Sequence, residues 1–193
     1  HTKVVQEKLN QARVAIAGLG GLGSNVAFFL ARAGVGHLHL IDFDRVDLTN
    51  LNRQQYSIRH LNRPKPEALK EELLEINPYL DIQTDFLKIQ REHIQELFQD
   101  ADVICEAFDQ PDQKAMLVNG VLELLPEKKM VSGSGMAGYG NSNAIQTRKA
   151  MGNLYLCGDE TTGIETGKCL MAPRVAICAA HEANQILELI LDE

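Results

Sequence analysis

Long hydrophobic runs and an excess of positive charge are both missing from this chain of 193 residues. No apolar stretch approaches the roughly 20 residues that a membrane-spanning helix needs, and the first residues form no apolar signal segment. With 19 Lys and Arg against 26 Asp and Glu, the formal net charge is −7. Proteins that bind nucleic acid usually present a basic face. We therefore expect no membrane contact and no extended nucleic-acid surface.

Paired cysteines are missing as well. The chain has four cysteines, Cys105, Cys157, Cys169 and Cys178, and none belongs to a C-x-x-C pair. Structural zinc sites usually contain such pairs, so no structural zinc is expected. This usage fits a reducing, cytoplasmic compartment better than a disulfide scaffold. Cys157 and Cys169 flank an acidic loop, but the sequence places no base beside either thiol that would activate it.

What the chain does contain is a regular alternation of strand and helix patterns. Strands are predicted at 14–17, 38–41, 81–86, 102–107 and 130–132, and helices at 22–33, 67–76, 91–98, 112–125 and 173–191. Such alternation predicts an α/β fold with a mostly parallel, Rossmann-like sheet and helices on both faces. Residues 144–148 and 153–157 predict a short antiparallel extension near the C-terminal part. We expect a single domain, residues 1–193.

A glycine turn between the first strand and the first helix indicates a nucleotide site. It contains Gly18, Gly20, Gly21 and Gly23. Glycines let the backbone approach phosphates, and the amides of the following helix point at them. The second strand ends in Asp42-Phe43-Asp44, where a carboxylate is placed to accept from ribose hydroxyls; Asp44 is the better exposed candidate. The alternative is a solvated carboxylate at a strand end. An NAD-dependent dehydrogenase would share these features.

The connection after the second strand is rich in amides and cations. Asn50, Arg53 and Gln54 lie close together in it, and Lys65 follows between two prolines. Arg53 is suited to bidentate contact with phosphate oxygens, and Lys65 to contact as a point charge. These residues are therefore candidates for a polyphosphate clamp. A polar surface loop of no function is the alternative.

Asp109 follows the fourth strand and has two interpretations. A carboxylate at this sheet edge is placed to hold Mg²⁺ against phosphates. It also precedes a helix with Pro111 near its start, as a helix N-cap would. The sequence alone leaves both open. His37 and His39 share one face of the second strand and are interpreted as structural, because no cysteine or carboxylate stands at ligand spacing from them.

Together these segments resemble the ThiF/MoeB family. The resemblance rests on GLGGLGS, DFDRVDLTNLNRQ, RPK, the strand that leads to Asp109, and the closing segment MAPRVAICAAHEANQILELIL. It covers roughly Lys8 to the C-terminus. It implies an ATP-dependent adenylyltransferase that activates the C-terminal carboxylate of a ubiquitin-like sulfur carrier as acyl-AMP, with release of pyrophosphate. The compact ThiF-type enzyme of thiamine biosynthesis is the most similar branch.

The resemblance also implies roles for individual residues. The glycines at 18, 20, 21 and 23 would line the phosphates, and Asp44 would take the ribose. Asn50, Arg53 and Lys65 would hold the triphosphate, and Asp109 would bind Mg²⁺. ATP and Mg²⁺ are thus the implied cofactors, and a small carrier protein and a second copy of the chain are the implied partners. Residues 158–168 match the family's crossover loop, over which the carrier's tail reaches the ATP site.

The chain departs from the family pattern in two places, which leaves alternatives open. Relatives carry an arginine near the N-terminus, whereas residues 1–12 contain none. No cysteine clearly matches a transfer cysteine. The missing arginine supports one alternative, a non-catalytic nucleotide-binding scaffold. A second alternative, activation of a tRNA-attached carboxylate, is suggested by the tRNA-modifying members of the family that the chain resembles.

Overall fold

A computed structural model describes residues 2–163 and 169–192 of the chain. Seven strands form one sheet: β1 (Arg13–Ala17), β2 (His37–Asp42), β3 (Asp81–Phe86), β4 (Val103–Glu106), β5 (Lys129–Gly133), β6 (Gln146–Met151) and β7 (Leu154–Gly158). The α-helices are α1 (Lys3–Gln11), α2 (Gly21–Ala33), α3 (Lys65–Ile76), α4 (Ile94–Phe98), α5 (Pro111–Leu124) and α6 (Ala172–Leu191). Short 3₁₀ turns occupy Leu48–Asn50, Ile58–His60, Arg91–His93 and Ser142–Ala144.

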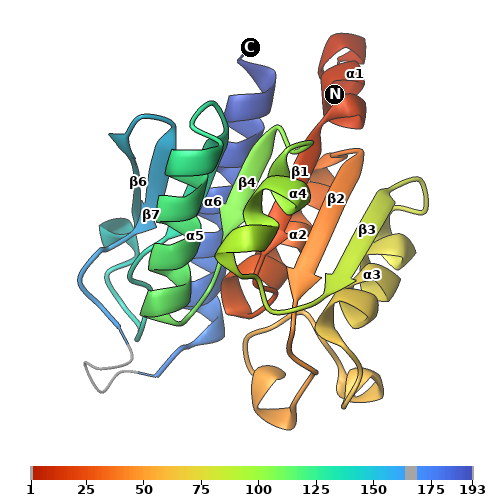
Figure 1. Cartoon of the computed structure of the whole chain (residues 1–193). Coiled ribbons are helices and arrows are strands. Elements are labelled where there is room, and N and C mark those ends of the chain that lie inside the picture. The colour runs from red at the N-terminus through yellow and green to blue at the C-terminus, as the bar shows by residue number, and fades with distance from the viewer. Residues whose placement is uncertain (1, 164–168, 193) are drawn as a thin grey trace.

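The strand order of the sheet is β3-β2-β1-β4-β5-β7-β6. All neighbouring strands pair in parallel except β6 and β7, which are antiparallel. The predicted antiparallel extension is therefore confirmed as the hairpin at one edge of the sheet. The carboxyl ends of the parallel strands lie at the bottom of Figure 1, where the orange connection between β2 and α3 also lies.

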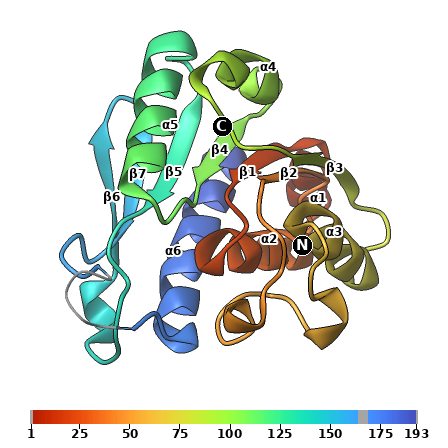
Figure 2. The same ribbon diagram turned by 60° about the horizontal axis from the view of Figure 1, so that its bottom comes forward.

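Helices cover both faces of the sheet, as predicted. Figure 2 shows α4 and α5 on one side and α2, α3 and α6 on the other. Strand β1 explains the division, because its side chains alternate between two cores: Val14 and Ile16 belong to the core with α2 and α6, and Ala15 and Ala17 to the core with α5. A parallel strand that is buried on both faces reads as a continuous apolar run.

The helix boundaries follow local signals. Helix α2 ends at Gly34, which adopts the left-handed conformation with a φ of +94° and whose amide donates to Leu30 and Ala31. Pro66 stands in the first turn of α3, and Pro111 begins α5. Helix α3 starts at Lys65, two residues before the predicted start, so this lysine is part of a regular element.

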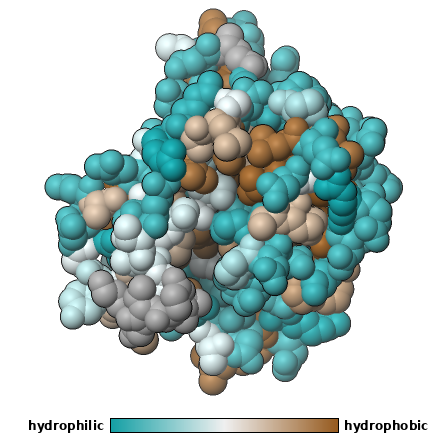
Figure 3. Space-filling model, turned by 60° about the vertical axis from the view of Figure 1, so that its left-hand side comes forward, coloured by the Kyte–Doolittle hydropathy of each residue, from teal (hydrophilic) through white to brown (hydrophobic). Residues whose placement is uncertain are grey.

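The surface is mainly hydrophilic on the side of the β6–β7 hairpin, with hydrophobic residues in separate patches (Figure 3). Among large apolar side chains, Ile58, Tyr79 and Tyr139 are widely exposed, and they lie on different connections. Across residues 2–163 and 169–192, every helix is too short or too polar to cross a bilayer.

Candidate functional site

The glycine turn closes tightly against the end of β4. Gly18 has a φ of +90°, and a Cβ added to it would lie 2.9 Å from the Ala107 carbonyl oxygen. A Cβ added at Gly23 would lie 1.8 Å from the carbonyl oxygen of Gly18. Gly23 therefore allows α2 to pack against the turn, and it does not line the cavity that holds the other predicted glycines. Close helix-to-strand packing is a known role of the last glycine in such turns.

Asp42 holds the turn in place through both of its carboxylate oxygens. One oxygen accepts from the amide of Leu19 at 2.6 Å, and the other accepts from the amide of Asp44 at 2.7 Å. Burial raises the pKa of Asp42, although nearby Lys65 and the two amides lower it. The hydroxyl of buried Tyr56 donates to the Leu19 carbonyl at 2.7 Å. Asp42 thus positions the turn, which leaves Asp44 as the candidate for ribose.

The N-terminus of α2 is open toward the same side. Its N-cap residue is Gly20, which has no side chain to cap the helix, and its first turn contains no acidic residue. Its second turn is tied to the 53–56 segment: Asn25 donates to the Arg53 carbonyl at 3.0 Å, and Gln55 donates to the Asn25 side chain at 2.7 Å. An uncapped helix N-terminus with free space before it favours anions.

Two cations from the connection after β2 lie beside this helix end. Lys65 is buried, and its ammonium lies 3.1 Å from the carboxylate of half-exposed Asp44. The guanidinium of Arg53 donates to the Thr49 carbonyl at 3.1 Å. Within the described residues, Arg53 Nε and Gln54 Oε1 are buried polar atoms without a partner. Buried polar groups are normally hydrogen-bonded, so these two atoms point to a missing ligand or water.

Asp109 reaches the site from the other side, after β4. The N-cap of α5 is Gln110, and no side-chain hydrogen bond caps that helix end. The helix-cap interpretation of Asp109 is therefore wrong. Asp109 is exposed and makes no hydrogen bond or ion pair to any other residue in the described ranges. Its carboxylate is free to receive a ligand.

All of the predicted site residues except Gly23 line one cavity of about 240 Å³, which we call the glycine-turn cavity. They are Gly18, Gly20, Gly21, Asp42, Asp44, Asn50, Arg53, Gln54, Lys65 and Asp109. The cavity also contains residues that the sequence did not reveal. Lys88 lies 5.6 Å from the ring centroid of Phe43, and Phe108, Gln113 and Met136 add to the wall. Lys88 follows β3, so the rule that sites lie after strand ends would have found it.

The remaining wall comes from the C-terminal part of the chain. Leu170 and Val175 line the cavity there, and Arg174 beside them is buried. Arg174 forms an ion pair with Asp159 at 2.6 Å and donates to the Asn141 carbonyl at 3.2 Å. Burial acts to raise the pKa of Asp159, but hydrogen bonds from Thr162, Thr161 and Arg174 outweigh it and hold that pKa well below its usual range. Residues 164–168 of the predicted crossover loop lie outside the described residues.

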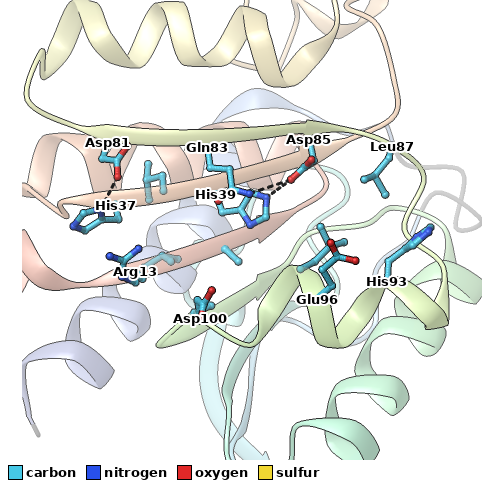
Figure 4. A pocket seen from close by; sticks show the side chains of 15 residues that line it. Arg13, His37, His39, Asp81, Gln83, Asp85, Leu87, His93, Glu96 and Asp100 are labelled. Carbon is cyan, nitrogen blue, oxygen red and sulfur yellow. Dashed lines mark hydrogen bonds and ion pairs between the residues drawn. The ribbon is translucent and has the colours of Figure 1, made fainter.

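A second cavity of about 260 Å³ lies on the α4 face of the sheet, over the β1–β3 strands, and we call it the histidine cavity. Figure 4 shows His37 and His39 on its floor, with Glu96 and His93 on the opposite side. The imidazoles lie 2.9 Å from Asp81 and 2.6 Å from Asp85, respectively. Contrary to the expectation from spacing, both histidines have carboxylate partners, which the neighbouring strand supplies.

Three of the four thiols are buried and poorly placed to react. Cys105, Cys157 and Cys178 are buried, and burial raises the pKa of Cys157 to about 12. A thiol that stays protonated at neutral pH is a poor nucleophile. Cys169 is exposed.

The glycine-turn cavity suits a phosphorylated ligand with one divalent cation. No group of three or more His, Cys, Asp or Glu side chains in the described parts of the chain is arranged to hold a metal by itself. Mg²⁺ does not need such a group, because it is usually bound by one or two carboxylates together with substrate phosphates. The unpaired Asp109, opposite the uncapped end of α2, fits that requirement.

Comparison with known proteins agrees with this geometry. The profile described as "ThiF family" matches residues 2–193. Molybdopterin-synthase adenylyltransferase of Escherichia coli is 30% identical over 190 residues, which cover 96% of this chain and 75% of that protein. The Haemophilus influenzae protein of the same name is 43% identical over 105 residues, or 54% of this chain and 43% of its own length. The chain thus spans less than half of the latter relative.

Solved structures show the same fold. E. coli tRNA N6-threonylcarbamoyladenosine dehydratase, TcdA, in complex with AMP superposes with a TM-score of 0.89 at 20% identity, covering 100% of this chain and 91% of that chain. The E. coli protein MccB gives a TM-score of 0.76 at 25% identity over 98% of this chain and 59% of its own. At this identity TcdA supports the Rossmann-like fold alone. The match of the family profile over residues 2–193 decides the assignment: the chain belongs to the ThiF family.

Proposed function

We propose that this chain is an ATP-dependent adenylyltransferase that activates the C-terminal carboxylate of a small ubiquitin-like sulfur carrier. One observation carries the proposal: the glycine turn, the two cations Arg53 and Lys65, and the unpaired Asp109 line the same cavity. The E. coli and H. influenzae relatives named as adenylyltransferases support it. We place the whole activity in a single domain, residues 1–193.

The proposed chemistry needs no nucleophilic side chain. A carboxylate oxygen of the carrier attacks the α-phosphorus of ATP, and the bond to the leaving pyrophosphate breaks. Negative charge builds up on the phosphate oxygens, and fixed cations stabilise it most when they are already in place. Lys65 is held by burial and by Asp44, and Arg53 by its bond to the Thr49 carbonyl. Both are therefore preorganised for this task.

Asp44 and Asp109 complete the proposal. Asp44 is half-exposed at the end of β2 and would accept from the ribose hydroxyls. Asp109 would hold Mg²⁺, which would offset charge on the phosphates when bound. Phe43 and Phe108 line the cavity and offer apolar surface for the base. We include a homodimer and a reducing cytoplasmic setting in the proposal, the latter because all four cysteines are free thiols.

The experiment is carrier-dependent ATP–pyrophosphate exchange. Arg53→Ala and Asp109→Ala should each lower the exchange rate by about 100-fold or more, as loss of a single charge-stabilising group typically does. Arg59→Ala and Asp112→Ala are matched controls, since these exposed residues lie outside the cavity. The controls should stay within about twofold, as surface substitutions usually do.

The choice of carrier is part of the same experiment. The thiamine-pathway carrier was expected from the sequence, whereas the relatives are named for molybdopterin synthase, so both Gly-Gly-ended carriers are supplied. Exchange with one of them identifies the substrate. Binding of NAD in preference to ATP, exchange that requires tRNA, or carrier binding without exchange would each reject carrier activation in favour of one alternative.

A further inference from the structure

The side chain of Asp109 is not anchored by any residue in 2–163 or 169–192. Its carboxylate is exposed and without a partner among the described residues, so its position depends on the backbone between β4 and α5. That backbone is pinned immediately before it, where the amide of Phe108 donates to Glu106 Oε1 at 2.8 Å. The placement of the carboxylate therefore depends on what holds Glu106.

Glu106 is fully buried at the end of β4, and each of its oxygens has a partner. Its second oxygen accepts from the ammonium of Lys114 and from the hydroxyl of Ser132. Lys114 also donates to the Gly133 carbonyl at 2.8 Å. We call Glu106, Lys114 and Ser132 the clasp. It joins the end of β4, the first turns of α5 and the end of β5.

The clasp closes the segment that contains Asp109. Lys114 follows Glu106 by eight residues, and Asp109 lies between them. The same carboxylate thus fixes the segment on both sides of Asp109, through Phe108 before it and through Lys114 after it. Ala107 and Phe108 also lie directly against Gly18, so the start of this segment has a second support that does not depend on Lys114.

The pair of Glu106 and Lys114 is not an efficient way to stabilise the fold. Glu106 is fully buried, whereas the Lys114 side chain is 29% exposed. Removing the Glu106 charge from water costs several kcal/mol, and well-packed apolar residues often replace such a pair without loss. A pair at this place is better explained by what it orients. Groups that orient metal-binding carboxylates by hydrogen bonds commonly set metal affinity.

We propose that Glu106 and Lys114 are positioning residues that hold Asp109 in its metal-binding geometry. The proposal rests on the proposed function, in which Asp109 holds Mg²⁺ beside ATP. Neither residue lines the glycine-turn cavity. Their effect should therefore be confined to the part of ATP binding that depends on Mg²⁺.

Calorimetric titration of ATP with and without Mg²⁺ tests this without carrier or turnover. Lys114→Met should raise the Mg²⁺ concentration needed for half-maximal enhancement of ATP binding by about 10- to 100-fold, as loss of such supporting groups does elsewhere. Metal-free ATP affinity should stay within about twofold, because Lys65 and Arg53 are untouched. Lys114→Arg should return the Mg²⁺ requirement to within about threefold, since it keeps the charge.

Folding is controlled separately. Lys114→Met leaves the Glu106 charge buried and unpaired, which can destabilise the chain. Glu106→Gln with Lys114→Met removes both charges and should restore the melting temperature while the Mg²⁺ requirement stays high. Glu123→Gln, in the exposed part of α5, is the matched control and should change neither quantity.

The decisive comparison uses Asp109→Asn as background. If the clasp acts through Asp109, Lys114→Met should cause no further loss there, because the group that it orients is already gone. An additive loss, or an equal fall in metal-free ATP affinity, would overturn the proposal while the proposed function stands. If wild-type ATP binding does not respond to Mg²⁺ or to Asp109→Asn, the metal role in the proposed function fails, and this inference fails with it.

Discussion

The two cavities of this molecule have almost the same size and very different side chains. The glycine-turn cavity has a volume of about 240 Å³ and the histidine cavity about 260 Å³. In the histidine cavity, His37 and His39 are already bonded to the aspartates of β3. In the glycine-turn cavity, Arg53 Nε, Gln54 Oε1 and the Asp109 carboxylate have no partner among the described residues. Among the described residues, buried polar atoms without a partner line the glycine-turn cavity and none lines the histidine cavity, so this feature, and not volume, distinguishes the two.

The largest expected effect tests this difference directly. Lys65→Met keeps the length of the buried side chain but removes its charge, and ATP–pyrophosphate exchange should fall by about 100-fold or more. His39→Gln removes an equally well-bonded group from the histidine cavity and should leave exchange within about twofold. Rates measured at saturating ATP, with melting temperatures for both variants, check the contrast. A large loss in His39→Gln would show that the histidine cavity also serves the reaction.

Sequence patterns were sufficient where a signal is local or follows from strand order. The strand at 81–86 was predicted with the bounds that β3 has. The rule that ligands bind at the carboxyl ends of parallel strands brought Lys65 and Asp109 together although 44 positions separate them in the sequence. Lys65 and Asp109 line the same cavity because the topology of the parallel sheet brings their connections to the same edge.

Contacts set by register or by packing were not predictable in the same way. His37 pairs with Asp81 because β2 and β3 align those residues side by side, and nothing in the local sequence marks the pairing. The role of Gly23 depends on the distance between α2 and the turn, which only the folded chain defines. The clasp of Glu106 and Lys114 was likewise invisible, since a strand residue and a helix residue meet in it only after the chain turns back.

Glu182 is a third case, because its buried carboxylate lacks hydrogen-bond partners among the described residues but lines neither cavity. It is fully buried on α6, both of its oxygens lack a partner among the described residues, and it faces Gly133. Burial raises the pKa of Glu182 well above its ordinary range; Lys114 lowers it and Glu106 raises it further. The buried carboxyl group of Glu182 therefore costs stability, and it lies outside both cavities.

The raised pKa of Glu182 makes the stability of the fold depend on pH. Above pH 4.5, the ordinary value, the unfolded chain releases the Glu182 proton while the folded chain keeps it. The stability contributed by this group is therefore complete below that pH and is lost as pH rises toward the folded-state pKa. The amide side chain of the variant Glu182→Gln cannot titrate. The free energy of unfolding of the variant, relative to that of the wild type, should therefore rise by about 1.4 kcal/mol per pH unit while the wild-type carboxyl stays protonated. Denaturant unfolding of both proteins at pH 5, 6 and 7 measures it, and a constant difference would mean that Glu182 is ionised in the fold.

The smallest expected effect concerns the pair His39 and Asp85. Their side chains are 15% and 33% exposed, and the atoms lie 2.6 Å apart. A contact between partly exposed polar side chains gains little, because solvent screens it and both side chains lose freedom. The coupling energy in a double-mutant cycle of His39→Gln and Asp85→Asn should therefore be below about 1 kcal/mol. Urea unfolding of the four proteins gives that energy. A coupling energy of several kcal/mol would mean that the pair is effectively removed from solvent. The histidine cavity would then be part of the protein core and not a solvated cavity.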